Sequence, residues 1–165
     1  MDAVTEDRDL TPYPFVVAPA YQLVDRELIR KFTSYAENGG HLLLTCRTGE
    51  KDRSGHLWEA LWAEPIYQLI GAKIPFYDLL PPPLEGHVTA EGKQYAWGSW
   101  GEILDPQSSA TVLATYTDQF YSGKPAAVTR KLGKGSVTYI GVDSDGGELE
   151  MALSCCSSRS AAWTT

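Results

Sequence analysis

The sequence predicts an α/β fold with a mostly parallel sheet and a β-hairpin near its C-terminal end. Residues 13–18 (YPFVVA) and 41–45 (HLLLT) are continuously apolar, which is typical of strands buried on both faces of a parallel sheet. An amphipathic helix is predicted between them, so these three elements form a βαβ unit. The glycine turn 132–135 separates two β-rich runs, 126–131 and 136–142, and predicts the hairpin.

The helix between the two apolar runs has recognisable ends. Asp25 is a suitable N-cap, and apolar residues follow it at helical spacing. Asn38, Gly39 and Gly40 provide the stop. We expect this helix to pack one face against the sheet.

The middle of the chain predicts short helical pieces followed by extended chain. Residues 57–61 and 65–70 are expected to be helical, and the second piece begins at a proline and stops at Gly71. Four prolines make residues 72–92 extended or irregular. Their apolar side chains still require burial, so the segment is not a domain boundary.

Beyond this segment the pattern is β until the last helix. Strands are predicted at 93–104 and 110–117, ahead of the hairpin, and a short helix at 148–153. We therefore expect residues 1–153 to form a single α/β domain. Residues 154–165 (SCCSSRSAAWTT) are small and polar, which predicts a frayed, low-complexity tail.

Composition excludes several classes of function. The 165 residues carry 14 basic and 21 acidic side chains, a formal charge of −7, so we expect no nucleic-acid partner. No apolar run is long enough to span a membrane, and the first residues are acidic, so a cytoplasmic location without a membrane partner is expected. His41, His56 and His87 are scattered, which predicts no metal site, and no cofactor motif is present.

Cys46 is a candidate nucleophile because it follows a predicted parallel strand. A thiol nucleophile needs a base, and no histidine follows the last strand. His41 lies about 16 Å away along its own strand, while His56 could approach through the loop. The alternative is that Cys46 is a small buried apolar residue. Cys155 and Cys156 are adjacent, and adjacent cysteines rarely bridge, so all three thiols are expected to be reduced.

Two other sets of residues are candidates for binding. Residues 46–55 form a polar loop at the carboxyl end of a predicted parallel strand, where open α/β sheets bind ligands, although such loops also serve as turns or interfaces. Trp97 and Trp100 could stack on a sugar ring. In an alternating strand, however, they lie on opposite faces, with Tyr95 beside Trp97, and ordinary sheet packing gives the same pattern.

Several motifs, in a fixed order, resemble one known family. They are VVAP at the end of the first strand, Arg47-Thr48-Gly49 with Lys51-Asp52 after the second, the turn 120–125 (FYSGKP), and Gly133-Lys134-Gly135 before a strand that ends at Gly141. Over about residues 9–142 the chain is similar to the trimerisation domain of bacterial β-galactosidases of glycoside hydrolase family forty-two.

The resemblance implies a three-layer fold like that of flavodoxin and the class I glutamine amidotransferases, with the catalytic triad lost. It also implies a role in assembly: self-association into a homotrimer, with the catalytic barrel of the parent glycosidase as the other partner. In that family the catalytic acid and nucleophile lie on the barrel, so no catalytic residue is carried over to this chain. The motif loop, Arg47, Thr48, Gly49, Lys51 and Asp52, becomes a candidate interface or ligand contact.

The chain departs from the family in two respects. The barrel is absent, and the residues after Glu150 do not resemble the family's continuation into a small β-rich domain. Three hypotheses follow. The first is a non-catalytic trimerisation domain of carbohydrate metabolism, separated from its barrel; the second is an amidotransferase-like hydrolase that uses Cys46; the third is a carbohydrate-binding module that uses the motif loop with Trp97 and Trp100.

Overall fold

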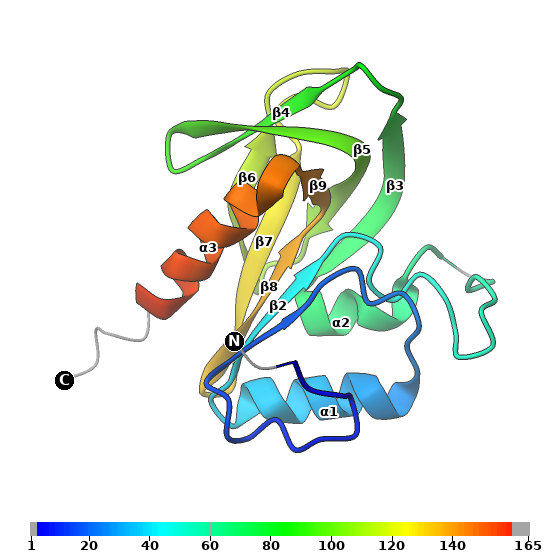
Figure 1. The fold of residues 1–165 in the computed structure, drawn as a ribbon, viewed down its shortest axis with the longest axis vertical. Coiled ribbons are helices and arrows are strands. Elements are labelled where there is room, and N and C mark those ends of the chain that lie inside the picture. Colours follow the sequence, from blue (N-terminus) through cyan, green and yellow to red (C-terminus); the bar gives the residue numbers. More distant parts are fainter. Residues whose placement is uncertain (1–2, 60, 160–165) are drawn as a thin grey trace.

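The structure is a computed structural model that describes residues 3–59 and 61–159. In these residues nine strands form one sheet, and three α-helices and two short 3₁₀ turns accompany it (Figure 1). In chain order the elements are β1 (Phe15–Ala18), α1 (Arg26–Glu37), β2 (His41–Thr45), a 3₁₀ turn (Glu64–Ile66), α2 (Tyr67–Ile70), β3 (Ala72–Leu80), β4 (Gly86–Ala90), β5 (Lys93–Pro106), β6 (Ala110–Tyr116), β7 (Pro125–Leu132), β8 (Gly135–Ile140), β9 (Val142–Ser144), a second 3₁₀ turn (Asp145–Gly147) and α3 (Glu148–Arg159).

The predicted βαβ unit is confirmed. β1 pairs in parallel with β2, with Phe15 opposite His41, and β2 pairs in parallel with β8. Asp25 caps α1, because its Oδ1 accepts a hydrogen bond of 2.7 Å from the N–H of Leu28. The helix buries one face against the sheet, through Leu28, Phe32, Tyr35 and Ala36.

The prediction of a mostly parallel sheet is wrong. The strand order is β1-β2-β8-β7-β6-β4-β5-β3, and every pairing beyond β2–β8 is antiparallel. Short turns explain the difference: two residues join β4 to β5 and two join β7 to β8. Parallel neighbours need a crossover of a dozen residues or more, whereas antiparallel neighbours need only such a turn. The second turn is the predicted C-terminal hairpin, which is confirmed.

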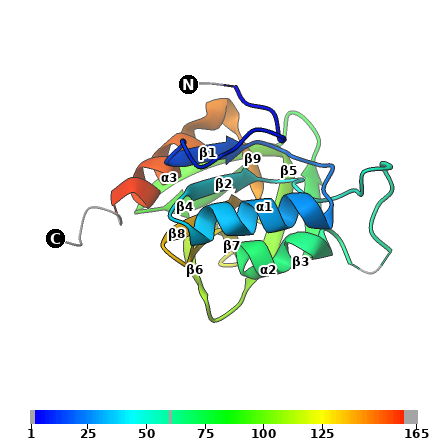
Figure 2. The same ribbon diagram turned by 90° about the horizontal axis from the view of Figure 1, so that it is seen from below.

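The sheet has a hydrophobic core on each face. Leu42 and Leu44 of β2 belong to the core that α1 and α2 cover, and Leu43 belongs to the opposite core, which includes Leu149 and Leu153 of α3. This alternation follows from the two-residue period of a strand. The helices therefore cover the sheet from both sides (Figures 1 and 2).

β9 links β8, beside β2 in the sheet order, to β5 near its end. β9 follows β8 after Gly141 alone and pairs with β5, which also pairs with β4 and β3. The backbone N–H of Glu102 donates to the carbonyl of Gly141 at 2.6 Å, and the Tyr116 hydroxyl donates to the carbonyl of Glu102 at 2.9 Å. A Cβ on residue 141 would lie 2.8 Å from that Glu102 carbonyl oxygen, so glycine is required for this approach.

Three local predictions differ from the structure. The described residues of 57–61 contain no helix, since Leu57 bridges Lys51 and the Trp58 indole binds the Gly49 carbonyl. Residues 72–92 are largely extended, as the prolines predicted, but they form the paired strands β3 and β4, and β3 accommodates Pro75 at a register shift at the edge of the sheet. The last helix passes Leu153 and ends at Arg159, while residues 160–165 of the predicted tail lie outside the described residues.

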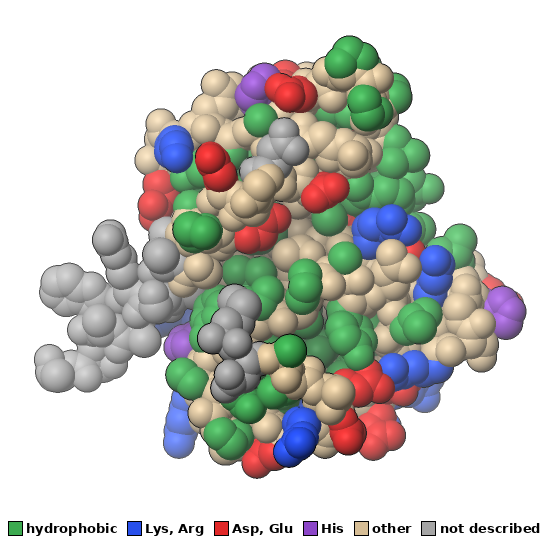
Figure 3. All heavy atoms as spheres, viewed as in Figure 1, with side chains coloured by type: hydrophobic (Ala, Val, Ile, Leu, Met, Phe, Trp, Pro, Cys, Tyr) green, Lys and Arg blue, Asp and Glu red, His purple; other side chains and the backbone are tan. Residues whose placement is uncertain are grey.

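Hydrophobic side chains remain exposed along β3 and the turn that follows it. In Figure 3 they gather at the upper right, where Figure 1 places this strand. β3 is the last strand in the sheet order. No helix within the described residues is long and apolar enough to cross a membrane.

Gly135 provides a test of how closely the hairpin packs on α1. A Cβ at this position would lie 2.0 Å from the carbonyl oxygen of Gly40 and 2.5 Å from that of Ala36. Because neither backbone group can rotate away, we expect Gly135→Ala to lower the free energy of unfolding by about 3 kcal/mol. Gly98→Ala is the matched control, since its Cβ would meet nothing within 4 Å, and it should change stability by less than about 0.5 kcal/mol. Urea unfolding measures both, and equal stabilities would contradict the packing described.

Candidate functional site

The motif loop begins where β2 ends and lies against the segment after β1. The Thr45 hydroxyl accepts the N–H of Ala20 at 2.8 Å, and the Thr48 hydroxyl accepts the N–H of Tyr21 at 3.2 Å while donating to the carbonyl of Thr45 at 2.7 Å. The Gly49 N–H donates to the Tyr21 carbonyl at 3.0 Å. The loop is thus fastened by its own threonines.

Gly49 and Asp52 also have structural roles. Gly49 has φ +76°, and a Cβ there would lie 2.6 Å from Cγ2 of Ile66, so both conformation and space require glycine. Asp52 Oδ1 accepts the N–H groups of Ser54 at 2.8 Å and His56 at 3.0 Å, which closes the following turn. Neither residue directs a free polar group toward a ligand.

The charged residues of the loop pair with a buried carboxylate. Glu50 is 2% exposed. Its Oε2 lies 3.2 Å from Nε of Arg47, and its Oε1 lies 3.2 Å from Nη2 of Arg47 and 3.1 Å from Nζ of Lys51. A buried carboxylate without a partner would destabilise the folded protein, so Arg47 and Lys51 serve to neutralise Glu50. Arg47 and Lys51 are therefore engaged by Glu50 and do not form a free anion-binding pair.

Glu102 is a central residue of this region that the sequence reading missed. Its side chain is fully buried; Oε1 accepts the backbone N–H of Arg47 at 2.9 Å and the indole N–H of Trp100 at 3.0 Å. Oε2 accepts the hydroxyl of Tyr139 on β8. The available signal was a single acid in the predicted strand 93–104, followed there by the apolar residues Ile103 and Leu104. Burial raises the pKa of Glu102, and the hydrogen bonds that its carboxylate accepts oppose the shift.

Cys46 does not have the surroundings of a nucleophile. Its side chain is 7% exposed, and burial, together with the negative charges of Glu102 and Asp143, raises the pKa of the thiol well above its ordinary value. A reactive cysteine requires the opposite shift. The ring of His41 pairs with Ser136 at the other end of β2, and His56 lies in an exposed turn beside Asp52.

The two candidate tryptophans lie on opposite sides of β5, as the alternation predicted. Trp97 is completely buried in the core that includes Tyr95. Trp100 is half-buried; Tyr77 stacks on it with ring centroids 4.4 Å apart, and Arg47 Cζ lies 4.9 Å from its ring centroid. Since protein side chains already occupy the indole surface, the structure gives no support to sugar stacking.

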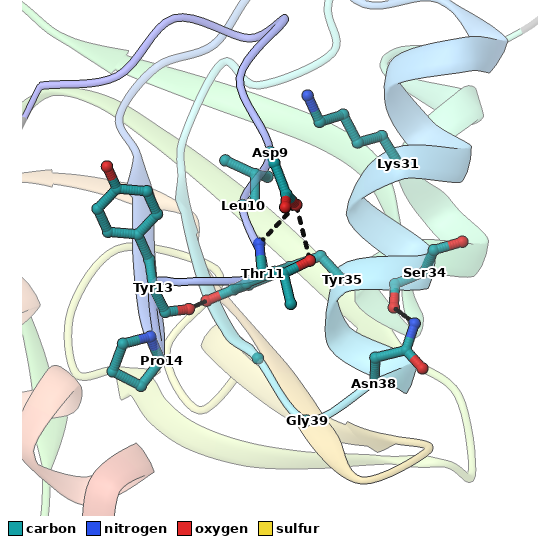
Figure 4. A pocket seen from close by; sticks show the side chains of 11 residues that line it. Asp9, Leu10, Thr11, Tyr13, Pro14, Lys31, Ser34, Tyr35, Asn38 and Gly39 are labelled. Carbon is teal, nitrogen blue, oxygen red and sulfur yellow. Dashed lines mark hydrogen bonds between the residues drawn. The ribbon is translucent and has the colours of Figure 1, made fainter.

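Hollows also open on the surface near these elements. One, of about 660 Å³, lies at the carboxyl ends of β1 and β2, and Val17, Leu79, Trp100 and Asp143 are among its lining residues. Another, of about 310 Å³, lies between residues 9–14 and α1 (Figure 4). In this hollow Asp9 accepts from Thr11, and the Tyr35 hydroxyl donates to the carbonyl of Tyr13 at 2.7 Å. Among the described residues, no group of histidine, cysteine and acidic side chains is arranged to hold a metal ion.

The raised pKa of Glu102 gives a stability that depends on pH. Between the ordinary carboxyl pKa and the raised one, the folded chain holds a proton that the unfolded chain has released, so the free energy of unfolding falls as pH rises through that window. We expect Glu102→Gln to remove this fall. Urea unfolding from mildly acidic to neutral pH gives the free energy of unfolding of both proteins, and the quantity to compare is the difference between them. Carboxylates with a lowered pKa, such as Asp25, contribute equally to both proteins and cancel in this difference. Parallel curves would contradict the assignment.

Cys46 should be unreactive in the folded chain. Its burial and raised pKa predict that a thiol reagent at slightly alkaline pH does not modify Cys46 until the chain unfolds. Mass spectrometry of the labelled peptides, with and without urea, measures this. Rapid labelling of Cys46 in the folded protein would contradict the assignment and revive its role as a nucleophile.

The comparisons with known proteins agree on one family. Residues 1–155 match the β-galactosidase trimerisation domain family. The chain is 36% identical over 141 residues to the β-galactosidase BgaH of Haloferax lucentense, covering 86% of this chain and 21% of that protein. It is 32% identical over 140 residues to the β-galactosidase LacA of Lactobacillus acidophilus, covering 85% and 21%.

Solved structures show the same relationship. The β-galactosidase of the Antarctic haloarchaeon Halorubrum lacusprofundi aligns with a TM-score of 0.88 and 34% identity, covering 98% of this chain and 24% of that chain. Gan42B, a β-galactosidase of glycoside hydrolase family 42 from G. stearothermophilus, aligns with a TM-score of 0.85 and 25% identity, covering 93% and 22%. The chain thus spans about a fifth to a quarter of the length of these relatives, and it belongs to the β-galactosidase trimerisation domain family.

Proposed function

We propose that this chain is a non-catalytic assembly domain that associates with copies of itself into a homotrimer. The observation that carries the proposal is the family match over residues 1–155, whose family description is a trimerisation domain. The side chains of the motif loop also favour the assembly role. Thr48, Arg47 and Lys51 form hydrogen bonds or ion pairs within the protein, as expected of a structural loop.

In a longer enzyme, we propose the catalytic barrel as the second partner of this domain. The β-galactosidases that it resembles are four to five times as long as the matched region, and the chain covers 21% of the first of them. On this proposal, galactoside hydrolysis belongs to the barrel. The buried thiol of Cys46 and the occupied surface of Trp100 support the assembly role over an amidotransferase-like hydrolase or a carbohydrate-binding module.

The parallel part of the fold suggests an origin. We propose that β1, α1, β2 and β8 correspond to the flavodoxin-like core of class I glutamine amidotransferases. The parallel pairing of these strands around one helical crossover supports the proposal. We also propose a cytoplasmic location, which the free thiol of Cys46 favours because that compartment keeps thiols reduced.

The mass of the purified chain in solution tests the assembly role. We expect light scattering to give three times the 18.1 kDa of one chain at high concentration, with dissociation on dilution. The same preparation should not release nitrophenol from a nitrophenyl galactoside. A single-chain mass at every concentration would overturn self-association, and turnover would overturn the non-catalytic assignment.

A further inference from the structure

The outer edge of β3 is open and apolar. β3 pairs with β5 on one side, and in the part of the chain that the structure describes no strand pairs with its other side. Along residues 76–80 (FYDLL) the described part of the chain offers this outer edge no strand partner, and the N–H of Leu79 donates to Oδ1 of Asp78 at 2.8 Å. An edge of this kind is a template for another strand or another chain.

Exposed apolar side chains line both faces of this strand. Phe76 is 38% exposed and stacks on Phe120, with ring centroids 6.1 Å apart, and Phe120 is 86% exposed. On the other face, Tyr77 stacks on Trp100 while Leu79 is 56% exposed. With Leu84 of the following turn, 58% exposed, these residues form what we call the β3 surface: Phe76, Tyr77, Leu79, Leu84 and Phe120.

The usual protection of an edge strand stops halfway along β3. Edge strands of soluble proteins carry lysine, proline or inward-pointing charges that prevent pairing. Lys73 and Pro75 provide this in the first half of β3. In the second half the one charge is Asp78, whose Oδ2 accepts the hydroxyl of Tyr121 at 2.6 Å. The distal half is therefore suited to being covered by a partner.

Charge favours a copy of this chain as that partner. Each chain carries a formal charge of −7, so two copies repel each other unless the contact lies where charge is sparse. The five side chains of the β3 surface are uncharged. The family to which the chain belongs is described as a trimerisation domain, and trimerisation is contact between copies of the same chain.

In a closed ring of three copies each contact joins two different patches, so each copy must also present a second surface. The hollow of about 660 Å³, which adjoins the β3 surface, provides this second surface. Leu79 lines it together with Val17 of β1, which is 41% exposed, and Trp100. The apolar surface thus continues from the edge of β3 toward the edge of β1.

We propose that the β3 surface is where a second copy of this chain docks, covering the outer edge of residues 76–80. The inference rests on the self-association proposed above and names the surface that performs it. Phe120, Leu84 and Leu79 are its most accessible apolar side chains, and their burial supplies the driving force.

Leu79→Lys tests the proposal, with Met151→Lys on α3 as the matched control. Both replace an exposed apolar side chain with the same charge, and Met151, 70% exposed, lies outside the β3 surface. Light scattering over a wide range of concentration should show that Leu79→Lys raises the concentration of half-association by at least about tenfold. Met151→Lys should associate as the unchanged chain does. Circular dichroism and thermal unfolding verify that both variants fold.

Amide hydrogen exchange on the unchanged chain gives a second measurement that needs no variant. Exchange at residues 76–80 should slow as concentration rises, while exchange elsewhere in the sheet stays constant. If the chain associates but Leu79→Lys associates equally well and exchange at 76–80 is unaffected, the β3 surface is overturned while self-association stands. That outcome would assign the surface to another partner, such as the barrel. If the unchanged chain is always single, both proposals fail.

Discussion

The hydrogen bonds accepted by the buried Glu102 carboxylate join parts of the chain that are distant in sequence. They connect the loop after β2, through the N–H of Arg47, to the indole of Trp100 on β5 and the hydroxyl of Tyr139 on β8. Without the carboxylate, these buried donors would lose their partners, each at a cost of about 1–3 kcal/mol. Arg47 has φ +67°, a conformation that non-glycine residues seldom adopt, and the bond to Glu102 stabilises it. The parallel and antiparallel parts of the sheet are fastened together at this point.

The strongest local sequence signals predicted the βαβ unit and the hairpin, whereas the helix expected at 57–61 was wrong and pairing between distant strands had no local signal. The apolar runs at β1 and β2, the Asp25 cap and the Gly133 turn each carry their information within a few residues, so the βαβ unit and the hairpin were predictable. Alternation identifies β5 as a strand but does not specify that it pairs with β3, β4 and β9. The motif loop was predicted as a loop, whereas its bond from Arg47 to Glu102 spans 55 residues and has no local signal.

The position of the motif loop explains why it resembles a ligand site without the free groups of one. Carboxyl ends of parallel strands bind ligands because their loops have spare hydrogen-bonding groups. Here Thr45 and Thr48 bind the segment after β1, Glu50 takes the charges of Arg47 and Lys51, and the raised pKa of Cys46 keeps its thiol protonated. These groups have partners within the chain, so the edge that serves catalysis in other α/β proteins holds the fold together in this one.

This internal use of polar groups has a consequence for assembly. An interface between copies needs a surface that keeps its shape when uncovered, since ordering a flexible segment on binding reduces affinity. β3 meets that need: β5 pairs with it along most of its length and is itself fixed by β4, by β9 and by the bonds at Glu102. The hydrogen bonds that occupy the polar groups of the loop after β2 therefore also give β3 a rigid support. Among the described strands β1 and β3 are the two ends of the sheet order, and β3 is the one whose outer edge carries the exposed apolar side chains of the β3 surface.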